Sequence, residues 1–285
     1  MIPPRTAWVP DWALIRTRFL ELRRHRPLVI AMIGGNLGIL LIMITAISVM
    51  HAVQPDVAPA GGGSRFTSFV FLMLATGVIT AMFLGAIVGS EDLSSKFFRA
   101  LVTTGRSRLA LYLARLPAGL ALLAAVIIPT YAVAVGCAVT LLPSRSFEYY
   151  YAFSSSTKAP GIHVILAAGG WLLLQLIVVY AITLAISALV GSEAPAVMIA
   201  TLLVLADLVL TTVMHSHVLW SWLRFVDIEW ILWGMRPHFP GIATCCGTLT
   251  GLSFSMPGWE QLLALVVWLV VPLGLGAYRS ITRDA

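Results

Sequence analysis

The chain has 285 residues, of which 59% are hydrophobic and only 11% charged. Charged residues make up about a quarter of an ordinary soluble domain, so this composition excludes a typical water-soluble enzyme. The net charge is +6 and the pI is about 9.6. We attribute this basic balance to membrane topology and anionic lipid, not to nucleic-acid binding. The composition therefore predicts an all-α, polytopic membrane protein.

Six apolar stretches are each long enough to cross a bilayer, for which a helix needs roughly 20 mostly apolar residues. The predicted spans are 28–50, 66–89, 112–141, 163–189, 195–214 and 260–278. The remaining segments are too short for a catalytic domain of ordinary size, so we expect one transmembrane domain over residues 1–285. The first stretch exceeds the core of a signal peptide, and we expect it to be retained.

Residues 1–27 are predicted to form a cytoplasmic amphipathic helix on the membrane surface. The carboxylate of Asp11 is placed to cap free backbone N–H groups at the helix start. An apolar stripe then recurs at helical spacing, made by Trp12, Ile15, Phe19 and Leu22. Arginines surround this stripe, a pattern typical of a helix that lies among lipid headgroups.

Residues 90–111 form the most informative polar segment, between the second and third spans. Ser90, Glu91 and Asp92 predict a helix start, where carboxylates stabilise the positive end of the helix dipole. An apolar stripe follows, made by Leu93, Phe97, Phe98 and Leu101. A short amphipathic helix of this kind needs a surface for its apolar face. Lipid headgroups or a partner subunit would both provide one.

If the chain crosses the membrane six times, its arginine and lysine residues are unequally distributed between the two sides. Thirteen lie on the side of the N-terminal segment, the second loop and the C-terminal tail, and five lie on the other side. Because cytoplasmic loops carry the excess of basic residues, both termini and the segment 90–111 are predicted to be cytoplasmic.

Three polar side chains within the spans are candidates for a substrate path: Asn36, Gln175 and Asp207. An ionised carboxylate in lipid is costly, so Asp207 should face protein or water, or be protonated. Asn36 follows two glycines, which favours close packing against another helix, and Gln175 is interpreted in the same way.

Residues 215–259 are predicted to lie on the outside as an interfacial or re-entrant helical element before the last span. Four of the nine tryptophans of the chain occur here: Trp220, Trp222, Trp230 and Trp233. Tryptophan prefers the membrane–water interface, so a passive aromatic belt is the alternative interpretation.

Two short sequences mark the ends of the segment 90–111. Gly89-Ser90-Glu91 stands at its start and Gly105-Arg106-Ser107-Arg108 near its end, with Arg115 further on. This arrangement resembles the permease subunits of type 2 ABC transporters, which are six-span proteins that mostly act as exporters. Their usual pattern has a glutamate at the helix end, a Gly-Thr helix start and then Pro-x-Ser-Arg. Here Ser94-Ser95 stands in place of Gly-Thr, and Thr104-Gly105 stands where the family has its proline region.

The resemblance implies that the segment 90–111 is a coupling helix, which receives motion from a separate ATP-hydrolysing subunit. The residues expected at this contact are Glu91, Asp92, Lys96, Phe97, Phe98, Arg99, Arg106, Arg108 and Glu193. It also implies a second permease copy, identical or different, with ATP and Mg on the partner subunit. The long apolar spans favour a hydrophobic or amphipathic cargo such as a drug, a peptide or a lipid. The resemblance implies efflux of this cargo, with import as the alternative direction.

The two lysines independently place ATP chemistry outside this chain. A P-loop requires Gly-Lys-Ser/Thr, in which backbone N–H groups and the lysine hold the phosphates. Lys96 stands between Ser95 and Phe97, and Lys158 between Thr157 and Ala159. Neither sequence fits, so we expect no catalysis and no cofactor in this chain.

Two other classes of membrane protein account less well for the sequence. An intramembrane serine protease needs a buried histidine base, but all six histidines lie in loops or at helix ends. A channel or secondary transporter without an ATPase partner is the main alternative, although the spans hold little charge for coupling to ions. The cysteines Cys137, Cys245 and Cys246 form no disulfide framework and are interpreted as packing residues.

Overall fold

The described part of the chain is entirely helical. The computed structural model describes residues 10–53, 62–94, 107–140, 161–213 and 258–282. Its helices are α1 (Trp12–Arg24), α2 (Arg26–Ile33), the π-helical turn η1 (Gly34–Gly38), α3 (Ile39–Val53), α4 (Gly63–Ser94), α6 (Arg108–Thr140), α7 (Ile162–Val190), α8 (Glu193–Val213) and α12 (Gly258–Thr282). No strand occurs in these ranges, so the predicted all-α class is confirmed for them.

Five helices are long and apolar enough to cross a membrane. They are Arg26–Val53, Arg65–Ser90, Arg108–Thr140, Ile162–Val190 and Gly258–Thr282. Their length and composition confirm the prediction of a multi-pass membrane protein. The searched part of α8, Glu193–Ala206, is apolar but shorter than these five helices. The predicted element at 215–259 lies outside the described residues, apart from the start of α12.

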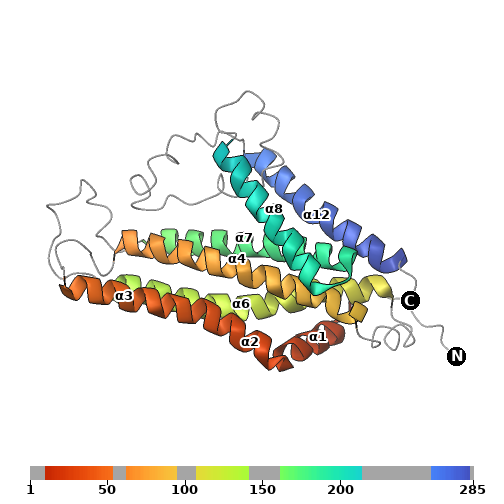
Figure 1. The fold of residues 1–285 in the computed structure, drawn as a ribbon, viewed down its shortest axis with the longest axis horizontal. Helices are drawn as coiled ribbons and strands as arrows, with labels where there is room; N and C mark the ends of the chain where they lie inside the picture. Colours follow the sequence, from red (N-terminus) through yellow and green to blue (C-terminus); the bar gives the residue numbers. More distant parts are fainter. Residues whose placement is uncertain (1–9, 54–61, 95–106, 141–160, 214–257, 283–285) are drawn as a thin grey trace.

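Three helices, α4, α6 and α7, form the centre of the molecule. The first span, made of α2, η1 and α3, lies beside them, and α8 and α12 are inclined to the bundle (Figure 1). The helix α7 packs along α4 and also contacts α12 and α8, while α1 packs against α6. Lipid tails offer helices no hydrophobic advantage, so these contacts must be stabilised by close packing and interhelical hydrogen bonds.

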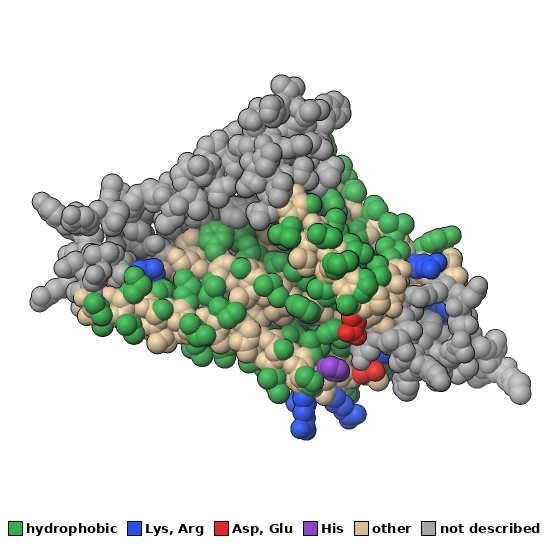
Figure 2. Space-filling view, in the orientation of Figure 1, with side chains coloured by type: hydrophobic (Ala, Val, Ile, Leu, Met, Phe, Trp, Pro, Cys, Tyr) green, Lys and Arg blue, Asp and Glu red, His purple; other side chains and the backbone are tan. Residues whose placement is uncertain are grey.

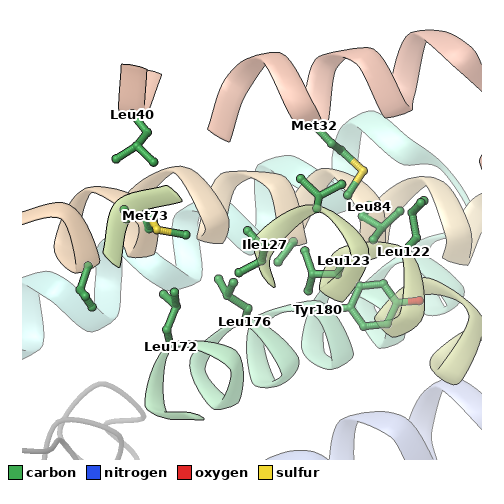
Figure 3. Packing of buried hydrophobic residues seen from close by; sticks show 14 of the residues in the cluster. Met32, Leu40, Met73, Leu84, Leu122, Leu123, Ile127, Leu172, Leu176 and Tyr180 are labelled. Carbon is green, nitrogen blue, oxygen red and sulfur yellow. The ribbon is translucent and has the colours of Figure 1, made fainter. Parts of the chain in front are cut away.

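The core lies between the first span, α4, α6 and α7. Figure 3 shows side chains from all four helices meeting there, namely Met32, Leu40, Met73, Leu84, Leu122, Leu123, Ile127, Leu172, Leu176 and Tyr180. Cys137 of α6 is a free thiol packed against the edge of this cluster, in agreement with its predicted packing role. Outward-facing side chains are also apolar, and hydrophobic groups cover much of the described surface in Figure 2, as expected for helices in lipid.

Four helices meet at one end of the bundle, which we call the base. Arg115, near the start of α6, bonds Gly89, near the end of α4. Arg108, at the start of α6, bonds the carbonyl oxygen of Ile281 in the last turn of α12. The last turn of α7 is there too, since Ser187 bonds α4. Most Lys and Arg side chains visible in Figure 2 lie toward this end.

The predicted helix boundary after the second span is wrong. The helix α4 does not end at Gly89 but runs to Ser94. Ser90 is buried, and its hydroxyl donates to the Ala86 carbonyl oxygen at 2.9 Å, one turn back in the same helix. A serine bonded in this way lies inside a helix and does not cap a new one. Glu91 therefore belongs to the last turns of α4, not to a helix start.

The N-terminal helix forms where predicted, but two details differ. Asp11 is the N-cap residue of α1, yet its side chain makes no capping hydrogen bond. The buried residues of α1 are Leu14, Arg18 and Leu22. Ile15 and Phe19 of the predicted stripe pack against the core cluster, whereas Trp12 of the same stripe is 74% exposed. The face of α1 that carries Leu14 lies against α6, where Leu14 packs against Leu111 and Ala114.

Candidate coupling site and buried polar residues

The segment that joins α4 to α6 is the predicted contact with an ATPase subunit. The predicted contact residues Lys96, Phe97, Phe98, Arg99 and Arg106 lie outside the described residues. Glu91 and Asp92 are placed by their backbone in the last turn of α4. The structure therefore describes the two helix ends that hold this segment, and the site is built from them.

Ser107 starts the helix on the far side of the segment. Its hydroxyl accepts a hydrogen bond from the Ala110 N–H at 3.1 Å, and its carbonyl accepts one from Leu111. This is N-capping chemistry, which satisfies donors that have no partner inside the helix. Arg108 follows, and its guanidinium donates to the Ile281 carbonyl oxygen at 3.3 Å. The Ser-Arg pair thus begins α6 and links it to the end of α12.

Arg115 joins the helices on the two sides of the segment. Its side chain is buried, and Nη1 donates to the carbonyl oxygen of Gly89 at 3.0 Å. A hydrogen bond from a charged donor is about twice as strong as one between neutral groups. Burial of a guanidinium away from water is unfavourable without such partners. The bond therefore holds the start of α6 against the end of α4.

Two further hydrogen bonds bring α7 into the same cluster. The hydroxyl of Tyr180 donates to the carbonyl oxygen of Arg115 at 2.9 Å. Ser187, two turns further along α7, donates to the carbonyl oxygen of Ala86 at 2.6 Å. We call Ala86, Gly89, Arg115, Tyr180 and Ser187 the base clamp. All its bonds go from side chains of one helix to the backbone of another.

Small residues let α4 and α7 approach closely at the base clamp. A Cβ atom on Gly89 would lie 2.8 Å from the Leu184 carbonyl oxygen, and one on Gly85 would lie 2.9 Å from the Tyr180 carbonyl oxygen. Real Cβ atoms essentially never come this close to a backbone. The Gly85-x-x-x-Gly89 spacing is the small-residue pattern that tightly packed membrane helices use. Backbone proximity here is what brings Ser187 within reach of α4.

The tripeptide Gly-Ser-Glu occurs at 89–91 and again at 191–193, with different structural roles. Gly191 has a φ of 80° and ends α7 in the left-handed conformation that glycine favours, with its N–H bonded to the Ser187 carbonyl oxygen at 2.8 Å. Glu193, a predicted contact residue, is exposed in the first turn of α8 at the base. Gly89 lies inside α4, so the two tripeptides are not a structural repeat.

Asn36 links the first span to α4. It is buried in the π-helical turn, and its amide nitrogen donates to the Thr80 hydroxyl at 2.8 Å and to the Met32 carbonyl oxygen at 2.8 Å. Its amide oxygen accepts from Thr76 at 3.1 Å. These bonds agree with the predicted role of Asn36 in close helix packing.

Gln175 makes no described bond to Asn36, and the side chain of Asp207 lies outside the description. Gln175 is buried in α7, and its amide nitrogen has no hydrogen-bond partner in the described part of the chain. No hydrogen bond connects it with Asn36 among the described residues. The backbone of Asp207 lies in α8, and its side chain is outside the description. A substrate path through these three residues stays a prediction.

The base clamp was largely missed by sequence reasoning. Arg115 was noted only as part of the family pattern, although an arginine inside a predicted apolar span is itself a signal of a buried partner. Tyr180 and Ser187 carry no such signal, because their roles depend on which face of α7 meets α4 and α6. No protein-family model matches this chain, and no curated protein matches it in sequence.

Proposed function

We propose that this chain is the membrane subunit of an ATP-driven transporter of the type 2 ABC class. In this proposal it exports a hydrophobic or amphipathic substrate, and a separate ATPase subunit hydrolyses ATP. The observation that carries the proposal is the base clamp, which joins α4, α6 and α7 beside the segment 95–106. A partner that moved this segment would move three spans together.

The contacts around the clamp extend this unit to other helices. Leu14 of α1 packs against Leu111 and Ala114 at the start of α6. Arg108 bonds the end of α12. Helix α7 approaches α12 at Gly276, where a Cβ atom would lie 3.2 Å from the Cα of Ala185. Tightly packed elements of this kind shift as units instead of deforming continuously. The base therefore has the construction expected of a part that transmits force from one side of the membrane.

The directions of the helices support six crossings. The end of α7 and the end of α12 both lie at the base, as the Ser187 and Arg108 bonds require. The helix α12 is inclined to the bundle, and its start lies away from the base, near the far end of α8 (Figure 1). The chain leaves α7 at the base and runs away from the base through α8 before α12 returns to it. We assign this sixth crossing to the predicted span 195–214.

The base is assigned to the cytoplasmic side. The exposed arginines Arg16, Arg23, Arg24, Arg26 and Arg279 belong to α1, the start of α2 and the end of α12, all next to the base. Arg65 near the start of α4 is the one arginine at the opposite end of the described bundle. Cytoplasmic ends carry such an excess of arginine. This orientation would bring the segment 95–106 to ATP.

The test is loss of the ATPase partner on removal of two aromatic side chains in that segment. The full tagged chain is purified from cross-linked membranes of its host, and partners are identified by mass spectrometry. We expect a subunit with a Gly-Lys-Ser/Thr P-loop that hydrolyses ATP. In Phe97→Ala/Phe98→Ala, removing two anchors worth about 2 kcal/mol each should lower its recovery at least about tenfold.

Ile79→Ala/Phe83→Ala is the matched control, because both side chains are exposed on α4 and away from the segment. It should retain the ATPase subunit. Equal amounts of both variants in the membrane exclude a failure of insertion. Absence of any ATP-hydrolysing partner of the wild-type chain would contradict the proposed function. Equal recovery of the partner in both variants would show that Phe97 and Phe98 of the segment 95–106 do not contribute to the contact with the ATPase subunit.

A further inference from the structure

Helix α1 carries two different faces. One face, with Leu14, Arg18 and Leu22, is buried against the protein. Ile15 and Phe19, which were expected to face lipid, are also packed against the core cluster. The opposite face is exposed and holds Trp12, Arg16, Leu20 and Arg23, again at helical spacing. The face that a membrane or partner would meet is therefore a mixture of arginines and large apolar groups.

The exposed face of α1 carries positive charge that is not paired within the described part of the chain. Exposed arginines at this face and at the α1–α2 corner are Arg16, Arg23, Arg24 and Arg26. None of the four forms an ion pair or hydrogen bond with a residue that the structure describes. Glu21 is the acidic residue of α1, and Arg18 from the buried face already holds its carboxylate at 2.8 Å. The four guanidinium groups are thus open to an external anion.

The position of these arginines is set by the first span. Helix α1 meets α2 at His25, and Arg26 is the first residue of the span. One turn later the outward surface is already apolar, with Ile30 68% exposed. Figure 2 shows basic side chains projecting outward from the corner of α1 and α2, beside the apolar surface. The arginines therefore lie at the depth where lipid headgroups begin.

We propose that the exposed face of α1, together with Arg24 and Arg26, binds the headgroups of anionic phospholipids. The guanidinium groups match phosphate oxygens in geometry and charge, and two or more phosphates fit along a helix of this length. Trp12 and Leu20 enter the region between headgroups and acyl chains, which suits tryptophan. Clusters of four or more arginines beside a span attract anionic lipid. This inference is independent of any ATPase partner.

The experiment measures lipid-dependent stability of the detergent-solubilised full chain. Thermal unfolding is followed while short-chain phosphatidylglycerol is added, and the midpoint rises as the ligand binds the folded state. Phosphatidylcholine and inorganic phosphate are titrated in parallel. We expect a salt-sensitive rise with phosphatidylglycerol alone. In Arg16→Gln/Arg23→Gln the apparent affinity should fall about fivefold for each arginine, hence about 25-fold in total.

Three comparisons decide the result. Arg279→Gln/Arg283→Gln removes equal charge near the end of α12 and should leave the affinity unchanged. Arg16→Lys/Arg23→Lys keeps the charge and should retain most of the binding, which also shows that changes on this exposed face leave the fold intact. An equal effect of inorganic phosphate, an equal loss in the α12 variant, or full affinity in Arg16→Gln/Arg23→Gln would each overturn the proposal.

Discussion

Arg115 is the residue on which the base of the bundle most directly depends. It is 4% exposed in a helix whose other buried residues are mostly apolar. A buried guanidinium is tolerated when its donors are paired. Here the Gly89 carbonyl oxygen takes one N–H, while the carbonyl of Arg115 itself accepts from Tyr180. One residue therefore connects three helices through both its side chain and its backbone.

Replacement of Arg115 by glutamine should destabilise the folded chain. The shorter side chain loses the bond to Gly89, and loss of a buried hydrogen-bond partner costs about 1–3 kcal/mol. The measurement is unfolding in detergent by heat or denaturant. Arg279→Gln, at an exposed position, should change stability by less than about 0.5 kcal/mol. If the two variants were equally stable, the Arg115 bond would not contribute to the fold.

At the scale of elements, the contact between α4 and α7 rests on the absence of side chains. Gly85 and Gly89 face the backbone of α7 at distances that exclude a Cβ atom. This approach stabilises the pair of helices through close packing and through the hydrogen bond from Ser187 to α4. Interhelical hydrogen bonds contribute about 0.6 kcal/mol each in membrane proteins. Size, not polarity, therefore sets the position of α7 on α4.

Gly89→Ala should destabilise the folded chain, whereas Gly136→Ala should not. At Gly89 the new methyl group collides with backbone atoms of α7, and overpacking of this kind costs about 1–3 kcal/mol. At Gly136, also within a helix, an added Cβ meets nothing within 4 Å. Alanine there should be neutral or stabilising by up to about 1 kcal/mol. Both variants are compared by unfolding in detergent, and a destabilised Gly136→Ala would argue against packing as the cause.

At the scale of the whole molecule, most of the described arginines lie at the base, together with the base clamp. The opposite end is also joined by hydrogen bonds, for example from the Gly62 N–H to the Ala138 carbonyl oxygen at 2.9 Å. Tyr131 adds a bond there, from its hydroxyl to the Ile165 carbonyl oxygen at 2.6 Å. The excess of arginine at one end is the asymmetry on which the proposed cytoplasmic orientation of the base rests.

Single-cysteine labelling should distinguish the two sides. In a chain without Cys137, Cys245 and Cys246, Ala100→Cys should react with an impermeant thiol reagent only from the cytoplasm. Ser155→Cys should react only from outside, because the predicted spans place an odd number of crossings between the two positions. The reverse labelling pattern would invert the assignment of the base. Labelling of both from one side would contradict the predicted crossing between them.

The sequence by itself determined the class of protein and the positions of the described helices. Each predicted span corresponds to a helix whose ends lie within five residues of the prediction. This accuracy has a physical cause, because a backbone in lipid must satisfy its own hydrogen bonds and a helix does so locally. Apolar length therefore reports helix position directly. The arginine-rich segment before the first span is also evident from the sequence, because it is a local run of charge.

Only the tertiary structure decided which faces and partners these helices use. Both sides of α1 carry apolar residues, so its sequence does not show which side is buried. The packing of Leu14 against α6 buries that side and leaves Trp12 exposed. Ser90 is able to cap a helix or bond within one, and the continuing backbone of α4 settled the choice. Arg115 finds its partners 26 and 65 residues away. Contacts over such separations depend on how helices pack, which no local pattern contains.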